Sequence, residues 1–133
     1  MIFPDEPDLA LLKKYDAIAV HCPEATTNII AGIMPAERLH RSGVRLALGS
    51  DVGSAEKPAM YRQIAWAVQL SKQRHFYFPE ESGIVTFPMA FYMATAEGGK
   101  AFDRVGLLEP GYRMDALVLR AEEEPEFPLS PAD

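Results

Sequence analysis

Two side chains that could do chemistry follow largely apolar runs of the sequence. His21 comes directly after residues 17–20, and Asp51 lies just beyond residues 44–48 and a glycine. A carboxylate can bind Zn²⁺ or carry a proton, and an imidazole can bind a metal or hydrogen-bond a substrate carbonyl. The spacing alone leaves a structural alternative open, in which Asp51 caps the following turn or helix and the ring of His21 bonds to backbone groups.

The remaining polar candidates favour structural roles. His40 lies between arginines on a short polar segment, and His75 follows Arg74, where a cation at a helix end interacts favourably with the helix dipole. Cys22 could ligate a metal as a thiolate, but the sequence holds one cysteine, which favours a buried and unreactive thiol. The sequence contains neither the glycine patterns of nucleotide-phosphate loops nor the Gly-x-Ser-x-Gly elbow of serine hydrolases.

A predicted strand–helix–strand unit positions the two main candidates. Residues 17–20 are apolar at successive positions, as expected of a parallel strand that is covered on both faces, and residues 44–48 are the next strand. Between them, a loop rich in Thr, Pro and Asn precedes residues 35–41, which begin with a proline and end before a glycine, as short helices do. Because binding and catalytic side chains gather at the carboxyl ends of parallel strands, His21 and Asp51 are both expected at that edge of the sheet.

Helices are predicted on both sides of this unit. Residues 9–14 form a short helix that Pro7 and Asp8 open, and residues 60–75, with apolar side chains at helical spacing, form the longest helix. Residues 76–85 contain a proline and a glycine and are expected to form a loop.

A second long helix follows Thr86, whose side chain can cap it. Its expected inner face carries Phe87, Ala90, Phe91 and Ala94. Gly98 and Gly99 then permit a close backbone approach or the end of the helix, and turn residues at 105–111 lead to a strand at 116–119. The resulting order β, α, β, α, α, β indicates an α/β fold that is part of a larger layered or barrel architecture.

Composition restricts the partners of the protein. Its 133 residues are 48% hydrophobic and 24% charged, which is typical of a folded globular chain. The net charge of −6 predicts no affinity for nucleic acid or for an anionic membrane surface. The single cysteine and the lack of a basic, apolar leader favour a cytosolic, cytoplasmic protein.

Five blocks occur in order and with compatible gaps, and together they resemble the carboxyl-terminal third of the amidohydrolase superfamily, with most similarity to guanine deaminases. The similarity extends over roughly residues 5–120. The blocks are VHCP at 20–23, GIMP at 32–35, GVRLALGSD at 43–51, AFYMAT at 90–95 followed by two glycines, and GLLEPG at 106–111 before DALVL at 115–119.

The resemblance implies a partial TIM (β/α)8-type barrel. Residues 1–114 would be the carboxyl-terminal part of the barrel, with 17–20 as strand seven and 44–48 as strand eight. Residues 115–120 would be a strand that returns to a small β-sandwich domain, and residues 121–133 an acidic, proline-rich tail.

The resemblance also implies a chemistry. Such enzymes hold one Zn²⁺ with a His-x-His pair on strand one, a His on strand five and an Asp at the end of strand eight, which matches Asp51. The implied reaction converts guanine and water to xanthine and ammonia, with Asp51 as both metal ligand and proton carrier. His21 would lie at the rim of the same pocket and contact the purine substrate.

The sequence departs from this pattern in ways that predict an inactive chain. It begins after strand six, so the histidines of strands one, five and six are missing, and one carboxylate cannot hold Zn²⁺ alone. The family's Pro-x-Ser-Asn is replaced by Pro23-Glu24-Ala25-Thr26.

Two hypotheses remain, beside the possibility of an unrelated small α/β domain. The chain is either a guanine deaminase fragment that needs a complementing amino-terminal half, or a catalytically dead half-barrel that acts as an oligomeric binding module. Both predict association, as a homo-oligomer or with that half.

Overall fold

The computed structural model describes residues 1–118, and the centre of its fold is a pair of parallel strands. Strand β1 (Ile18–His21) lies beside β2 (Arg45–Leu48), with Ile18 opposite Arg45 and His21 opposite Leu48. These are the only two strands in the described part of the chain. The α/β class and the parallel pairing predicted from the sequence are therefore confirmed.

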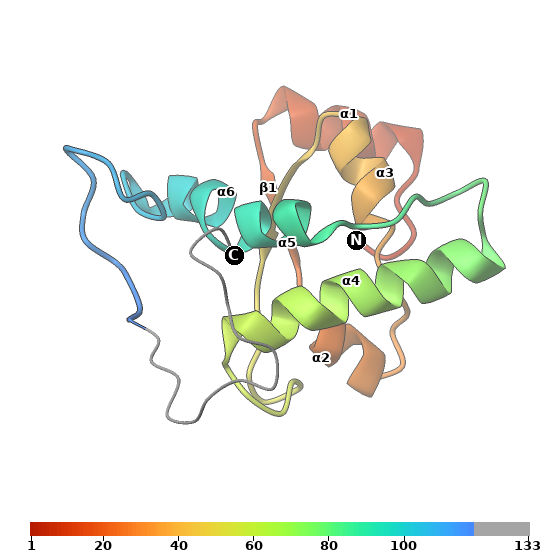
Figure 1. The fold of residues 1–133 in the computed structure, drawn as a ribbon. Coiled ribbons are helices and arrows are strands. Elements are labelled where there is room, and N and C mark those ends of the chain that lie inside the picture. The colour runs from red at the N-terminus through yellow and green to blue at the C-terminus, as the bar shows by residue number, and fades with distance from the viewer. Residues whose placement is uncertain (119–133) are drawn as a thin grey trace.

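Helices surround the two strands on several sides (Figure 1). Figure 1 shows α1 and α3 near the beginnings of the strands, α2 beyond their carboxyl ends, and α4 running across the molecule between α2 and α5. The helices are α1 (Glu6–Lys14), α2 (Pro23–Asn28), α3 (Ala36–Arg41), α4 (Met60–Tyr77), α5 (Phe87–Ala94) and α6 (Ala96–Gly99), followed by the 3-10 helix η1 (Lys100–Phe102). None of the helices within residues 1–118 combines the length and the apolar character needed to cross a membrane.

Helix α1 begins earlier than the sequence predicts. Its N-cap is Asp5, whose side chain accepts a hydrogen bond from the backbone N–H of Asp8, while the side chain of Asp8 accepts one from the N–H of Asp5. This reciprocal capping satisfies two backbone donors that a helix start otherwise leaves free. Asp8 therefore takes part in the cap, as predicted, but it lies inside the first turn of the helix and not before it.

Helix α2 was predicted as a loop, and that prediction is wrong. Its threonines and asparagine have low helix propensity, which is the reason the sequence favoured a loop. Pro23 occupies a first-turn position, which favours a helix start, and the hydroxyls of Thr26 and Thr27 bond within the helix to the carbonyl of Pro23. Helix α2 packs against α4, so tertiary contact adds to this local structure.

One face of the two-stranded sheet is buried in the hydrophobic core, which also draws on α1, α3, α4 and α5. The core consists of Leu9, Ala19, Met34, Ala36, Leu39, Val44, Leu46, Leu48, Ile64, Ala67, Val85, Ala90 and Met93. The sequence predicted cover on both faces of β1, but Val20 is 53% exposed. Successive side chains of a strand point to opposite faces, so Val20 points away from the core that buries Ala19 and His21.

Helix α5 has the predicted cap and a different inner face. The hydroxyl of Thr86 accepts a hydrogen bond from the N–H of Met89, as expected. Ala90 and Met93 are buried, whereas Phe87 and Phe91 are 61% and 50% exposed and stack on each other. The small side chain of Ala90 suits the side of α5 that packs against β2, and this leaves the two rings outside.

Gly98 and Gly99 make the close approach that the sequence predicted. A Cβ atom on Gly99 would lie 2.0 Å from the carbonyl oxygen of Val105, so only glycine fits there. Residues 115–118 are in no strand, and 119–120 lie outside the described residues, so the strand at 115–120 and the division at residue 114 stay predictions. The predicted tail at 121–133 also lies outside the described residues.

A polar network fixes the amino end of β2 to α6. The guanidinium of Arg45 lies 2.7 Å from the carboxylate of Glu97 and 2.7 Å from that of Asp16. Tyr92 and Lys100 also donate hydrogen bonds to Glu97. Burial raises the pKa of Glu97, but these donors outweigh burial and hold the pKa at about 2, below its ordinary 4.5.

We expect Glu97→Gln to lower the free energy of unfolding by about 1–3 kcal/mol at pH 7, because hydrogen bonds to a buried charge are lost. A carboxyl with a lowered pKa stabilises the fold above its unfolded pKa and loses this effect as pH falls. The difference from wild type should therefore shrink between pH 4.5 and pH 2. Urea unfolding measures it, with the exposed Glu80→Gln as a control that should change little; a difference that is constant with pH would contradict the assignment.

Candidate functional site

The carboxyl ends of β1 and β2 meet because the strands are parallel and in register. Beyond the last pair, the N–H of Gly49 donates a hydrogen bond to the carbonyl of His21 at 2.9 Å. A Cβ atom on Gly49 would lie 2.7 Å from Val20 Cγ1 and 3.0 Å from Cys22 Sγ. A side chain at position 49 would thus push the two strand ends apart.

Asp51 lies at this edge, as the sequence predicted. It is exposed and has a φ of 51°, a left-handed conformation that costs most residues energy but that Asp tolerates better than most. Its carbonyl accepts hydrogen bonds from the N–H groups of Ser54 and Ala55, which closes a turn. Burial, and after it the negative charge of Asp51, raises the pKa of the Cys22 thiol, so the carboxylate acts on this strand end.

The structure differs from the alternative in which the side chain of Asp51 caps the following turn or helix. The N-cap of α4 is Ala59, and no side chain caps this helix. Asp51 closes its turn through its backbone carbonyl, which leaves the carboxylate at the surface. An exposed oxygen donor at the end of a parallel strand is available to a metal or to a substrate.

His21 lies elsewhere than at the predicted rim. Its side chain is 1% exposed, on the core face of β1 opposite Leu48, whereas Val20 and Cys22 flank Gly49 on the other face. The structure does not bring its ring together with Asp51. Burial lowers the pKa of His21 from 6.5 to about 4, so the ring is neutral at pH 7. Among residues 1–118 its Nδ1 has no hydrogen-bond partner, so this nitrogen does not bond to the backbone as the alternative predicts.

Helix α2 supplies polar residues near the site that sequence reasoning missed. The amide nitrogen of Gln63 donates a 2.6 Å hydrogen bond to the buried carboxylate of Glu24, and the guanidinium of Arg62 lies 3.7 Å from that carboxylate. The side-chain amide of Asn28 donates to the carbonyl of Ser54 at 2.8 Å. Glu24 stood out in the sequence only as a departure from the family pattern, and without a predicted helix nothing related it to Asn28.

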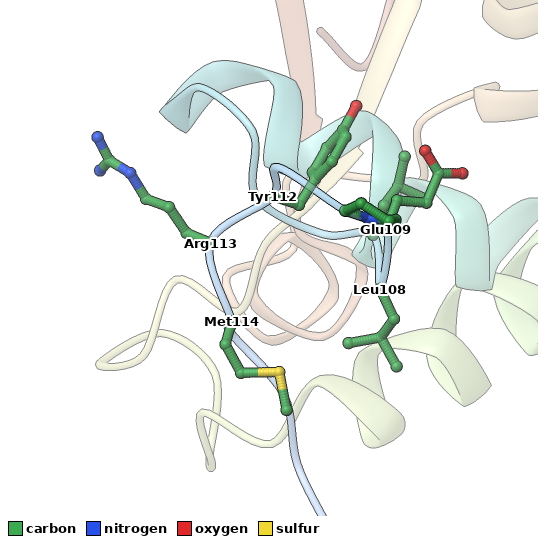
Figure 2. A pocket seen from close by; sticks show the side chains of 7 residues that line it. Leu108, Glu109, Tyr112, Arg113 and Met114 are labelled. Carbon is green, nitrogen blue, oxygen red and sulfur yellow. The ribbon is translucent and has the colours of Figure 1, made fainter.

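Two hollows in residues 1–118 are lined by residues other than Asp51. Figure 2 shows one, a hollow inside the turn after η1, where Leu108, Tyr112 and Met114 are among the lining side chains. A second hollow lies along α4 beside Arg62 and Trp66. Neither His21 nor Asp51 lines these two hollows.

The described residues do not form a metal site by themselves. Within residues 1–118, no three His, Cys, Asp or Glu side chains come together in a way that could hold a metal ion. A catalytic Zn²⁺ takes about three protein ligands. Asp51 fits as one such ligand, and further ligands would have to come from outside the described residues.

The sequence as a whole identifies the family. Residues 1–130 match the sequence profile of the Amidohydrolase family. The chain belongs to this family. The similarity stated from the five sequence blocks is thereby confirmed for the amidohydrolases.

Curated relatives among the amidohydrolases are deaminases. A 5-methylthioadenosine/S-adenosylhomocysteine deaminase of Carboxydothermus hydrogenoformans is 28% identical over 131 residues, which are 96% of this chain and 29% of the relative. A probable guanine deaminase of Deinococcus radiodurans is 28% identical over 122 residues, 90% of this chain and 27% of the relative. The chain thus spans less than a third of the length of these relatives.

Solved amidohydrolase structures are similar in fold. A guanine deaminase from C. acetobutylicum with guanine bound in its active site gives a TM-score of 0.78 at 32% identity, over 84% of this chain and 26% of that one. An adenosine deaminase from Xanthomonas campestris with bound zinc gives 0.70 at 26% identity, over 82% and 25%.

We expect the stability of the chain to fall as pH drops below 6.5, because the unfolded His21 takes up a proton that the buried ring does not. The loss should reach about 2 kcal/mol by pH 5, and it is absent above pH 6.5. Urea unfolding of His21→Leu should show a much flatter profile. The exposed His40→Gln is the control and should keep the wild-type profile; equal profiles for His21→Leu and wild type would show that the ring is not buried.

Proposed function

We propose that this amidohydrolase chain is the carboxyl-terminal barrel part of a zinc-dependent deaminase that acts on a purine ring, with guanine as substrate. The observation that carries the proposal is the placement of Asp51, an exposed carboxylate just beyond β2 and beside the end of a parallel neighbour. In barrels of this class, that edge is where catalytic groups are found.

Asp51 has the chemistry of a ligand and of a proton carrier. A bound Zn²⁺ would supply a water whose pKa is lowered toward 7. The carboxylate of Asp51 would hold one position on the ion and accept a proton at its free oxygen. The sequence holds three histidines, of which His21 is buried, and His40 and His75 lie on α3 and α4. We therefore propose that the other ligands come from a complementing amino-terminal half and that the isolated chain is inactive.

The relatives support a purine as substrate. The C. acetobutylicum structure holds guanine, which favours conversion of guanine to xanthine and ammonia. The deaminase of Carboxydothermus is named for 5-methylthioadenosine and S-adenosylhomocysteine, so adenine-type nucleosides are the second candidate substrates. Both reactions replace an exocyclic amino group of a purine by oxygen, and an assay with both substrates separates them.

The open sheet supports the need for a partner. In residues 1–118 each strand has one neighbour, and Val20 is exposed on the face away from the core. Unpaired strand edges favour pairing with further strands. The amino-terminal half of a barrel would supply them, and a second copy of this chain in a catalytically dead, oligomeric binding module is the alternative. A cytoplasmic location stays a prediction.

We expect Asp51→Asn to reduce deamination on the order of 10²–10⁴-fold, because the proton-carrying carboxylate is lost. The chain is produced alone and joined to the polypeptide encoded immediately upstream, and zinc content and turnover of guanine and 5-methylthioadenosine are measured. Asp103→Asn is the matched control, since Asp103 is also exposed and has a φ of 57°. It should keep wild-type activity.

The other outcomes separate the hypotheses. Turnover of 5-methylthioadenosine alone would replace guanine as the substrate. A joined, folded protein that binds no zinc and deaminates neither purine would refute the enzyme proposal and favour the binding module. An active Asp51→Asn variant would refute the role of Asp51.

A further inference from the structure

We propose that Asn28 is a positioning residue for Asp51: helix α2, anchored to α4 through Glu24, holds the turn that presents the Asp51 carboxylate. The inference rests on the proposed function for the role of Asp51. The contacts that carry it lie in the described residues and can be measured without any enzymatic activity.

The first contact joins α2 to the Asp51 turn. The side-chain amide of Asn28 donates a 2.8 Å hydrogen bond to the carbonyl of Ser54. The N–H groups of Ser54 and Ala55 in turn donate to the carbonyl of Asp51, at 3.1 and 3.0 Å. Asn28 therefore holds the same peptide segment that closes the turn around Asp51.

The second contact anchors α2 itself. The carboxylate of Glu24 is 3% exposed and accepts the 2.6 Å hydrogen bond from Gln63. Arg62 lies 3.7 Å from Glu24 and forms a 3.0 Å ion pair with Glu56, which belongs to the loop before α4. A buried carboxylate that lost these partners would be costly, so the pair selects one position of α2 against α4.

The two contacts act from one side of α2. Glu24 and Asn28 are four residues apart and therefore lie on the same helix face. Glu24 binds the first turn of α4, and Asn28 binds the turn that begins at Asp51, so this face holds both ends of the segment between them. Figure 1 shows α2 on the side of α4 away from α5, beyond the carboxyl ends of the strands.

The conformation of Asp51 explains why such support is needed. Its φ of 51° is in the left-handed region, where a residue with a Cβ atom persists when surrounding contacts determine the backbone. The turn is exposed at Asp51, Val52 and Gly53, and burial reaches it at Ala55, which is 4% exposed. The hydrogen bond from Asn28 adds a constraint at Ser54, between the buried Ala55 and the exposed residues of the turn.

Amide hydrogen exchange on the full 133-residue chain tests the inference. In Asn28→Ala, we expect the Ser54 and Ala55 amides to exchange about 5-fold faster, because the turn opens more often once one hydrogen bond is lost. The Leu46 and Ala47 amides of β2 should be unchanged. Thr27→Ala is the matched control, because its hydroxyl bonds within α2 to Pro23, and Asn28→Gln, which keeps the donor, should restore part of the protection.

Two results would overturn the inference. One is unchanged exchange at Ser54 and Ala55 in Asn28→Ala; the other is an equal rise in β2, which would indicate general destabilisation. In the joined protein, Asn28→Ala should lower kcat about 5-fold with KM within about twofold, and an unchanged kcat in an active enzyme would also refute the positioning role. If the wild-type joined protein deaminates neither purine, the proposed function fails, while the exchange result still decides whether Asn28 holds the turn.

Discussion

The parallel pairing of β1 and β2 is the constraint on which the rest of the structure depends. Parallel strands cannot be joined by a tight turn, so the chain between them must cross back along the molecule, and it does so through α2 and α3. The same pairing brings both carboxyl ends to one edge. The bond from the N–H of Gly49 to the carbonyl of His21 extends the pairing past the strands and fixes where the Asp51 loop begins.

The two ends of this sheet differ in how their charged side chains are held. At the amino end of β2, Arg45 and Glu97 form a partly buried ion pair that attaches α6. At the carboxyl end, Asp51 is exposed, and the polar contacts come from a six-residue helix and the start of α4. In parallel barrels, residues at the amino ends of strands serve stability and those at the carboxyl ends serve function, so this difference agrees with the proposed barrel segment.

The sequence predicted the elements that depend on local patterns, and it failed where tertiary contact decides. Apolar runs and a proline–glycine asymmetry located β1, β2 and α3 to within one residue, and the position of Asp51 followed from the parallel strands. Helix α2 was missed because its threonines and asparagine have low helix propensity, and its packing on α4 is a tertiary contact. His21 was predicted at the pocket rim because the predicted strand ended at Val20. In the structure β1 includes His21, whose side chain points to the core face, and no sequence pattern indicates which face of the strand is the core.

The left-handed backbone at Asp51 has a consequence for how such a chain can diverge. Asn and Asp are the non-glycine residues best suited to that conformation, and the two have nearly the same shape. A single-base change in an Asp codon gives Asn, which preserves the turn while it removes the negative charge. The backbone geometry at this position therefore tolerates the loss of the negative charge, so that the fold can persist after a single-base change has removed the proposed chemistry.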